Sequence, residues 1–245
     1  MKVSVITIAF NSENVISQTI KSVLAQTYHE IEYLIIDGVS NDRTVEVAES
    51  YRKKAEAMGI DYKVYSEPDN GIYDAMNKGI YRATGDIIGI INSGDCYADI
   101  AVETAVKTFH DTDCELIFAD VCMIRKDGSS FIKKAKQSKF QTSRNWNHPT
   151  MFVKAEISKK YPYRMLGIHD DYGFYLQMQK QNRRIVTIPK VLARFYMGGA
   201  SNYKSLTAAG KRIMDRYKYC YRINGYSRWY MLECIFIEAL KFFLG

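Results

Sequence analysis

The chain lacks the signals that mark several classes of protein. Its five cysteines are odd in number and form no CxxC pair, which argues against a disulfide framework and a zinc site and indicates a reducing compartment. No segment reaches about 18 apolar residues without charges, so we expect no membrane-spanning helix. Residues 1–6 run directly into a strand pattern, so we also expect no signal peptide. These absences favour a cytoplasmic protein.

Two glycine-rich signatures of nucleotide binding are also missing. Neither GxGxxG nor GxxxxGK[ST] occurs, which excludes a dinucleotide fingerprint and a P-loop. The negative charge of a bound diphosphate would then be met by a metal ion or by Lys and Arg side chains. The chain has only four prolines, no Pro/Gly-rich linker and no internal repeat, so we expect one domain with a C-terminal appendage.

The composition is that of a folded globular protein with an excess of positive charge. Of the 245 residues, 47% are hydrophobic and 25% are charged, and the formal net charge is +7. The first half alternates strand and helix patterns. Strands are predicted at 3–9, 31–36, 62–65 and 86–91, and helices at 15–24, 45–58 and 73–83, the first with cap-like residues at 11–13. This alternation predicts an α/β fold with a parallel sheet covered on both faces.

The second half is less regular. A helix at about 99–109 and a strand at 115–124 are followed by a segment, 125–147, that is typical of a β-ribbon or a mobile loop. The pattern then predicts a helix around 171–181, two strands at 185–188 and 191–196, and a helical, aromatic and basic tail at 205–244.

Polar clusters follow four of the predicted strands, at 8–11, 37–40, 67–71 and 92–95. Each cluster alone is weak evidence, because polar strand-to-helix loops are common. Together they mark the edge of a parallel sheet at which ligands bind. The cluster at 92–95 is the most informative, because Asp95 follows a buried strand and can hold a divalent cation against phosphates. Gly94 stands where a second carboxylate is expected.

Several stretches, in order and with plausible spacing over about residues 1–200, resemble family 2 glycosyltransferases. They are 3–11 (VSVITIAFN), 22–28 (SVLAQTY), 35–44 (IIDGVSNDRT), 66–79 (SEPDNGIYDAMNKG) and 83–86 (ATGD). The resemblance implies the GT-A fold, a Rossmann-like and mostly parallel sheet flanked by helices, and an inverting reaction. It implies a catalytic domain over 1–203, with a nucleotide-binding half at about 1–98 and an acceptor-binding half at about 99–203, and a separate tail at 204–245.

The same resemblance implies roles for single residues on the donor side. Ala9, Asn11 and Asp37 would line the nucleoside pocket, with Asp37 accepting from the uracil or ribose. Asp69 and Asn77 would lie near the nucleotide and the donor sugar. Asp95 would ligate Mg²⁺ or Mn²⁺ at the diphosphate. The chain departs from the family pattern at Gly38 and at Gly94, each of which replaces an acid.

On the acceptor side, Asp171 matches the catalytic base and Asp170 its acidic neighbour. Two adjacent carboxylates repel, which raises the pKa of one of them and makes it a better base. The alternative is a pair of acids that stabilise a helix N-terminus. His148 matches a histidine near the acceptor, although a lone His is more often structural, and His169 is a weaker candidate for the metal or diphosphate. Gly198 and Gly199 resemble a loop near the diphosphate, but a simple turn also explains them.

The tail combines basic and aromatic residues with an apolar helix. Glu233, Glu238 and Lys241 fall within one sector of about 140°, and the rest of this helix is apolar. Such a segment suits peripheral anchorage in a membrane interface. Packing on the catalytic domain or a homodimer contact, taken together, is an equally open alternative. No nucleic-acid-binding motif is present.

The sequence thus predicts a membrane-associated glycosyltransferase at the inner face of the cytoplasmic membrane. It would move one sugar from a nucleotide donor, a UDP-sugar by preference, to a lipid-linked or saccharide acceptor in cell-surface polysaccharide biosynthesis. One alternative is a catalytically degenerate sugar-nucleotide-binding module, suggested by Gly38 and Gly94. Another is a sugar-nucleotide pyrophosphorylase, which would need a basic glycine-rich loop at 8–14, where no basic residue occurs.

Overall fold

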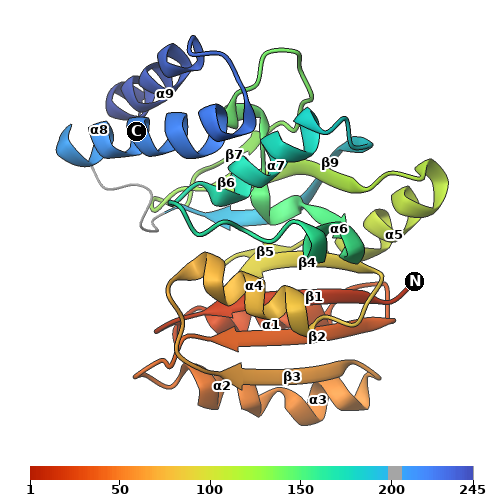
Figure 1. Cartoon of the computed structure of the whole chain (residues 1–245). Helices are drawn as coiled ribbons and strands as arrows, with labels where there is room; N and C mark the ends of the chain where they lie inside the picture. Colours follow the sequence, from red (N-terminus) through yellow and green to blue (C-terminus); the bar gives the residue numbers. More distant parts are fainter. Residues whose placement is uncertain (198–205, 245) are drawn as a thin grey trace.

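The structure is a computed structural model that describes residues 1–197 and 206–244. Within these residues, nine strands form one sheet in the order β3-β2-β1-β4-β8-β6-β9-β5, and β7 pairs with β6 (Figure 1). The strands are β1 (Val3–Ala9), β2 (Ile31–Asp37), β3 (Asp61–Ser66), β4 (Ile87–Asn92), β5 (Cys96–Tyr97), β6 (Leu116–Ile124), β7 (Ser130–Lys133), β8 (Phe152–Lys154) and β9 (Ile185–Tyr196).

The sheet is mostly parallel, as predicted. Strands β1 to β4 run parallel, and so do β6 and β9. Strand β8 lies antiparallel between β4 and β6, and β5 pairs antiparallel with β9. The pattern did not predict β5 and β8, because strands of two and three residues are too short to show an alternation of side chains.

Helices cover both faces of the sheet (Figure 1). The helices are α1 (Ile16–Leu24), α2 (Thr44–Ser50), α3 (Arg52–Ala57), α4 (Ile72–Arg82), α5 (Ala101–Thr112), α6 (Ala155–Lys160), α7 (Asp170–Lys180), α8 (Leu206–Asp215) and α9 (Tyr230–Leu244), with short helical segments η1 (Ser143–Asn145), η2 (His148–Thr150), η4 (Arg216–Tyr221) and η5 (Arg222–Asn224). One buried cluster joins α1 and α5 to the sheet, and a second joins α4, α7 and the C-terminal segments to its other face. The sheet is therefore buried on both sides, which explains its continuous apolar strands.

Two predicted boundaries differ from the structure. The predicted strands 185–188 and 191–196 are one strand, β9, because Pro189 and Lys190 form a bulge between Ile188, opposite Ala119, and Val191, opposite Asp120. A proline has no N–H to donate and is tolerated at such a bulge. The predicted helix at 45–58 is divided at Tyr51 into α2 and α3.

The C-terminal segments α8, η4, η5 and α9 form a helical appendage that packs on α7. Cys220 and Tyr221 belong to the same buried cluster as Tyr172 of α7. The Asn224 amide donates to the Gly173 carbonyl at 2.9 Å, and the Tyr226 hydroxyl donates to the Leu176 carbonyl at 3.2 Å. One side of the tail therefore packs on the rest of the chain, as one of the predicted alternatives had it. Within the described part of the chain, no helix is both long and apolar enough to cross a membrane.

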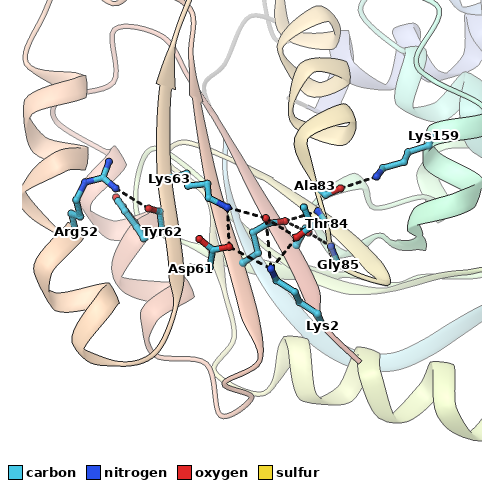
Figure 2. A network of polar contacts seen from close by, with 11 residues as sticks. Lys2, Arg52, Asp61, Tyr62, Lys63, Ala83, Thr84, Gly85 and Lys159 are labelled. Atoms are coloured by element: carbon cyan, nitrogen blue, oxygen red, sulfur yellow. Dashed lines mark hydrogen bonds and ion pairs between the residues drawn. The ribbon is translucent and has the colours of Figure 1, made fainter.

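A polar network fixes the edge of the sheet where β1, β2 and β3 begin. Its centre is Glu32, whose side chain is fully buried. The carboxylate accepts from the Ser4 hydroxyl at 2.5 Å and from the backbone N–H and hydroxyl of Thr84 at 2.7 and 2.9 Å. Figure 2 shows Lys2, Lys63 and Thr84 around this point, and the Lys63 ammonium lies 3.4 Å from the Glu32 carboxylate. These contacts tie the segment before β4 to the first strands.

Replacing Glu32 by Gln should lower the free energy of unfolding by about 2–4 kcal/mol, because it leaves buried donors and two lysines without their carboxylate. Burial acts to raise the pKa of Glu32, but the Ser4 and Thr84 hydrogen bonds lower it by more. Because the folded pKa lies below the unfolded value of 4.5, this stabilisation is present above about pH 4.5 and is lost as the pH falls through the folded pKa. Denaturant unfolding at pH 7 and pH 4 measures both effects.

The matched control is Glu56→Gln. Glu56 is 56% exposed and lies 4.0 Å from Arg52, so its loss should cost less than about 0.5 kcal/mol. Equal destabilisation by the two variants would contradict the role assigned to Glu32.

Candidate active site

The four polar clusters meet at one edge of the sheet, opposite the edge that Glu32 fixes. In the parallel register Ala9 lies beside Asp37, Asp37 beside Ser66, and Ile8 beside Asn92. Ala9 is buried at the end of β1. The carboxyl ends of β1 to β4 thus bring together loops that are far apart in the sequence, which is where open α/β sheets bind ligands.

Asn11 and Asp37 order the first two of these loops. The Asn11 side-chain carbonyl accepts from the Asn41 N–H at 2.9 Å, and the Asn11 N–H donates to the Ser40 hydroxyl at 2.8 Å. Asp37 is fully buried and accepts from the Ser40 N–H at 3.0 Å and the Ser66 hydroxyl at 2.7 Å. These contacts hold the two loops against each other. They also order the Asp37 carboxylate, for which the resemblance implies a contact with the uracil or the ribose.

Gly38 makes room for a carboxylate from another loop. A Cβ at position 38 would lie 2.5 Å from Asp69 Oδ2, which real side chains do not allow. Asp69 is half-buried, and its other oxygen accepts from the Gly71 N–H at 2.8 Å. The acid that is missing at position 38 is therefore replaced in space by Asp69 from the loop after β3.

Phe10 and Val39 lie at the same edge and were not among the predicted site residues. Phe10 is 59% exposed, and its Cδ2 atom would lie 3.4 Å from a Cβ at Gly38. An exposed ring beside a carboxylate is suited to stack on a planar group such as a nucleobase. Val39 is also exposed and has φ +61°, a strained value for a β-branched residue. Apolar side chains within polar strand-end loops are the sequence signal that marks both residues.

Asp95 lies in a tightly held turn after β4. Its N–H donates to the Asn92 carbonyl at 3.1 Å, and its backbone carbonyl accepts from the Thr19 hydroxyl at 2.7 Å. The Tyr196 N–H at the end of β9 donates to Asp95 Oδ1 at 3.1 Å. Burial raises the pKa of Asp95 to about 7, although the Tyr196 hydrogen bond opposes this. The carboxylate is therefore costly to keep charged until a cation approaches it.

The donor set of this turn fits a hard divalent cation. Asn92 Oδ1 is buried and has no hydrogen-bond partner within the described residues, so an amide oxygen joins the Asp95 carboxylate as an available ligand. No group of three or more His, Cys, Asp or Glu side chains suited to a metal occurs in residues 1–197 and 206–244. Mg²⁺ and Mn²⁺ accept such sparse oxygen sites when phosphates and waters supply the other ligands.

Gly94 is explained by its backbone rather than by lack of space. A Cβ at this position would lie no closer than 3.6 Å to Val15, which is an ordinary contact. Its φ of +99° is a value that L residues rarely adopt. The turn that presents Asp95 therefore depends on glycine at the position where a second acid was expected.

Asp171 lies in the first turn of α7, which begins one residue earlier than predicted. The Tyr73 hydroxyl donates to Oδ1 at 2.7 Å, and the Trp146 indole N–H donates to Oδ2 at 3.3 Å. Burial acts to raise the pKa of Asp171, but the neighbouring His148 and the Tyr73 hydrogen bond lower it by more, so it lies below the usual value. Asp171 is consequently a carboxylate at neutral pH.

The adjacent carboxyl is the one whose pKa is raised. Asp170 is buried, and burial raises its pKa with a further contribution from the charge of Asp171. Asp170 Oδ2 accepts from the Leu166 N–H at 2.7 Å. Repulsion between the two acids therefore acts on Asp170 and not on the expected base, and Asp170 holds the loop that precedes α7.

Of three other predicted residues, Asn77 and His169 make hydrogen bonds within the protein and His148 is buried. The Asn77 amide donates to the Tyr163 carbonyl and accepts from its N–H, both at 2.9 Å, so it holds this backbone segment in place. Burial lowers the pKa of His148, and its Nε2 is shielded from solvent without a partner among the described residues. His169 Nε2 lies 3.0 Å from Arg216 Nη2, which can only donate, so His169 accepts there. Gly198 and Gly199 lie outside the described residues.

Comparison with known proteins agrees with the fold. The family model "Glycosyl transferase family 2" matches residues 4–172. An uncharacterised glycosyltransferase of Mycobacterium tuberculosis is 45% identical over 97 residues, which are 39% of this chain and 35% of the relative. The putative teichuronic acid biosynthesis glycosyltransferase TuaG of Bacillus subtilis is 30% identical over 131 residues, 54% of this chain and 51% of the relative.

Solved structures share the architecture. TarS of S. aureus in complex with UDP superposes with a TM-score of 0.67 at 20% identity, over 98% of this chain and 66% of that chain. A mannosyltransferase from Pyrobaculum calidifontis in complex with GDP-Man and Mn²⁺ has a TM-score of 0.64 at 16% identity, over 89% of this chain and 61% of that one. The fold is that of a GT-A glycosyltransferase. The chain belongs to glycosyltransferase family 2. Its matches span about a third to a half of these curated relatives.

Proposed function

We propose that the protein is an inverting glycosyltransferase that takes one sugar from a UDP-linked donor. The observation that carries the proposal is the Asp171 carboxylate, which two donors, Tyr73 and Trp146, hold at the start of α7. A protein that only bound nucleotide would need no ionised acid in this place. The proposal therefore favours an enzyme over a degenerate binding module.

The donor nucleotide binds at the carboxyl ends of β1 to β4. Phe10 stacks on the base, and Asp69 accepts from the base or the ribose. TarS has been solved with UDP and with UDP-GlcNAc, which supports a uridine nucleotide. Arg194 is exposed and pairs in the β5–β9 ladder with Cys96, the residue that follows Asp95. It therefore offers a positive charge to the diphosphate. A pyrophosphorylase stays disfavoured because residues 8–14 contain no basic side chain.

Asp95 and the Asn92 side-chain oxygen would hold Mg²⁺ or Mn²⁺ between the protein and the diphosphate. The bound cation would neutralise the charge that develops on the leaving nucleoside diphosphate. The Thr19 hydroxyl of α1 holds the backbone of Gly94 and Asp95, so the turn is ordered before the donor arrives.

Asp171 then acts as the general base. The acceptor hydroxyl oxygen forms a bond to the anomeric carbon as the bond from that carbon to the diphosphate oxygen breaks, and the hydroxyl proton passes to Asp171. Attack opposite the leaving group inverts the anomeric centre. Tyr73 and Trp146 keep the carboxylate oriented and ionised for this transfer.

The acceptor would be lipid-linked or a saccharide of a cell-surface polymer. The loop before α7, which Asp170 holds, exposes the apolar side chains of Met165, Leu166 and Ile168 close in sequence to the base. The name of TuaG refers to teichuronic acid biosynthesis, which supports a polysaccharide pathway. A lipid-linked acceptor would place the enzyme at the inner face of the cytoplasmic membrane.

A thermal-unfolding screen of nucleotide sugars tests the donor proposal. Saturating UDP or a UDP-sugar with Mn²⁺ should raise the Tm by about 5–10 °C, and either component alone by much less. Nuclear magnetic resonance of the product formed from the most stabilising donor should show inverted anomeric configuration. Stabilisation by no nucleotide, with or without Mn²⁺, would contradict the proposal, and a product with retained configuration would contradict the mechanism.

A further inference from the structure

One face of α9 exposes a continuous apolar surface. Trp229, which directly precedes α9, is 74% exposed, and Leu232, Ile235 and Phe236 within α9 are 59%, 46% and 55% exposed. Taking about 100° per residue, the three side chains within α9 cover an arc of about 100° on one side of the helix. The opposite side contains the buried residues Glu233, Cys234, Ile237 and Glu238. We call the four exposed residues the α9 apolar face.

The orientation of α9 is the reverse of that of an ordinary surface helix, which turns its charged side chains to water. Glu238 is buried between two arginines of the appendage, with its carboxylate 2.8 Å from Arg212 and 3.3 Å from Arg216. Glu233 accepts from the buried Tyr221 hydroxyl at 3.0 Å. These bonds fix the rotation of the helix. The polar contacts of Glu233 and Glu238 therefore hold the helix in the orientation that exposes its apolar face.

The surface charge of the same appendage is positive. Between residues 207 and 240, the exposed charged side chains are Lys211, Lys218, Arg222 and Arg228. The acids of this segment are the buried Glu233 and Glu238 and the half-buried Asp215. An apolar face within a positively charged segment is complementary to an anionic lipid surface, which attracts basic residues and accepts apolar side chains at the headgroup boundary.

We propose that the α9 apolar face docks on an anionic membrane surface. A second copy of the chain fits less well, because a two-fold contact brings the same surface together and would place the basic side chains of one copy beside those of the other. Docking through the α9 apolar face would bring the protein to an acceptor held in the membrane, and this step rests on the proposed lipid-linked acceptor. A Cβ at Gly167, in the loop before α7, would lie 3.6 Å from Tyr219 of η4, so the appendage adjoins the apolar loop next to Asp171.

Co-sedimentation with vesicles tests the proposal. The full chain should bind phosphatidylcholine vesicles that contain about 30% phosphatidylglycerol, and bind them more weakly at high salt or without the anionic lipid. Leu232→Gln/Phe236→Gln should lower the partition coefficient about ten-fold or more. Arg222→Gln/Arg228→Gln should lower it about 30-fold at low salt and should flatten the salt dependence.

The matched control is Met58→Gln/Ile100→Gln, which removes two exposed apolar side chains from another part of the molecule and should leave vesicle binding unchanged. All variants should keep the Tm of the unmodified chain and its stabilisation by UDP and Mn²⁺. Absence of vesicle binding by the unmodified chain, or equal binding by the Leu232/Phe236 variant, would overturn the proposal. A dimer in analytical ultracentrifugation that the same variant dissociates, without vesicle binding, would assign the face to a second copy. If the protein is stabilised by UDP and Mn²⁺ but does not bind vesicles, the membrane proposal is wrong and the donor proposal stands. If it binds vesicles but is not stabilised by any nucleotide, the donor proposal is wrong and the membrane proposal stands.

Discussion

Replacing Asp171 by Asn is expected to lower the rate of sugar transfer by about 10²–10⁴-fold, because an amide cannot take the proton of the acceptor hydroxyl. The variant keeps an oxygen that can accept from Tyr73, so the start of α7 should remain in place. The thermal stabilisation by UDP and Mn²⁺ should therefore stay unchanged. Initial rates of UDP release with acceptor present, together with the thermal shift, separate loss of catalysis from loss of binding.

The neighbouring acid provides the control. Asp170→Asn keeps the acceptor for the Leu166 N–H and changes a carboxyl that burial already makes harder to ionise. We expect at most a several-fold loss of rate. Full transfer activity in Asp171→Asn, or an equal loss in both variants, would contradict the assignment of the base.

Replacing Asp95 by Asn should abolish the joint binding of metal and donor, because it removes the one carboxylate of the turn. Without ligands the variant should be more stable than the unmodified chain at pH 8. The folded pKa of Asp95 is about 7 and the unperturbed value is 3.8, so ionisation costs folding stability as the pH rises between these values. Asn avoids that cost, and the Tm at pH 8 should rise by a few °C. The Mn²⁺-dependent shift and the unliganded Tm measure the two effects.

The same titration predicts that donor affinity in the unmodified chain falls as the pH drops below about 7, since a proton then competes with the cation for Asp95. Asp99→Asn, an exposed acid four residues along the chain, should change neither affinity nor stability. Retained Mn²⁺-dependent stabilisation in Asp95→Asn would contradict the metal assignment.

The long elements could be predicted from the sequence because their apolar patterns are strong and local. The strands at 3–9 and 31–36 and the helix at 73–83 are close to β1, β2 and α4. The short strands β5 and β8 could not be predicted, because only their partners in the sheet define them. The family and the GT-A fold followed from motifs, and both are confirmed.

The chemistry of the site depends on contacts between distant residues, which a pattern cannot show. The pKa of Asp171 is lowered by His148 and by the Tyr73 hydroxyl, which lies 98 positions earlier, whereas burial raises the pKa of Asp170. In the sequence, Gly38 indicates the loss of an acid, and only the structure shows that the Asp69 carboxylate lies beside it. In the tail, the sequence pattern indicated the sector of the last helix that contains Glu233 and Glu238, but the contacts with Arg212, Arg216 and Tyr221 that turn these acids inward could not be predicted.

The attachment of the appendage to α7 has a consequence for how the chain can be divided. Asn224 and Tyr226 donate hydrogen bonds to the backbone of α7, the helix that contains Asp171. Tyr221 belongs to the same buried cluster as the apolar side chains of α7. A shortened protein that ends before α8 would lose these bonds and leave apolar side chains of α7 in water. The tail and the proposed catalytic base are therefore not independent modules, and a graft that replaced the tail would also have to rebuild the packing behind α7.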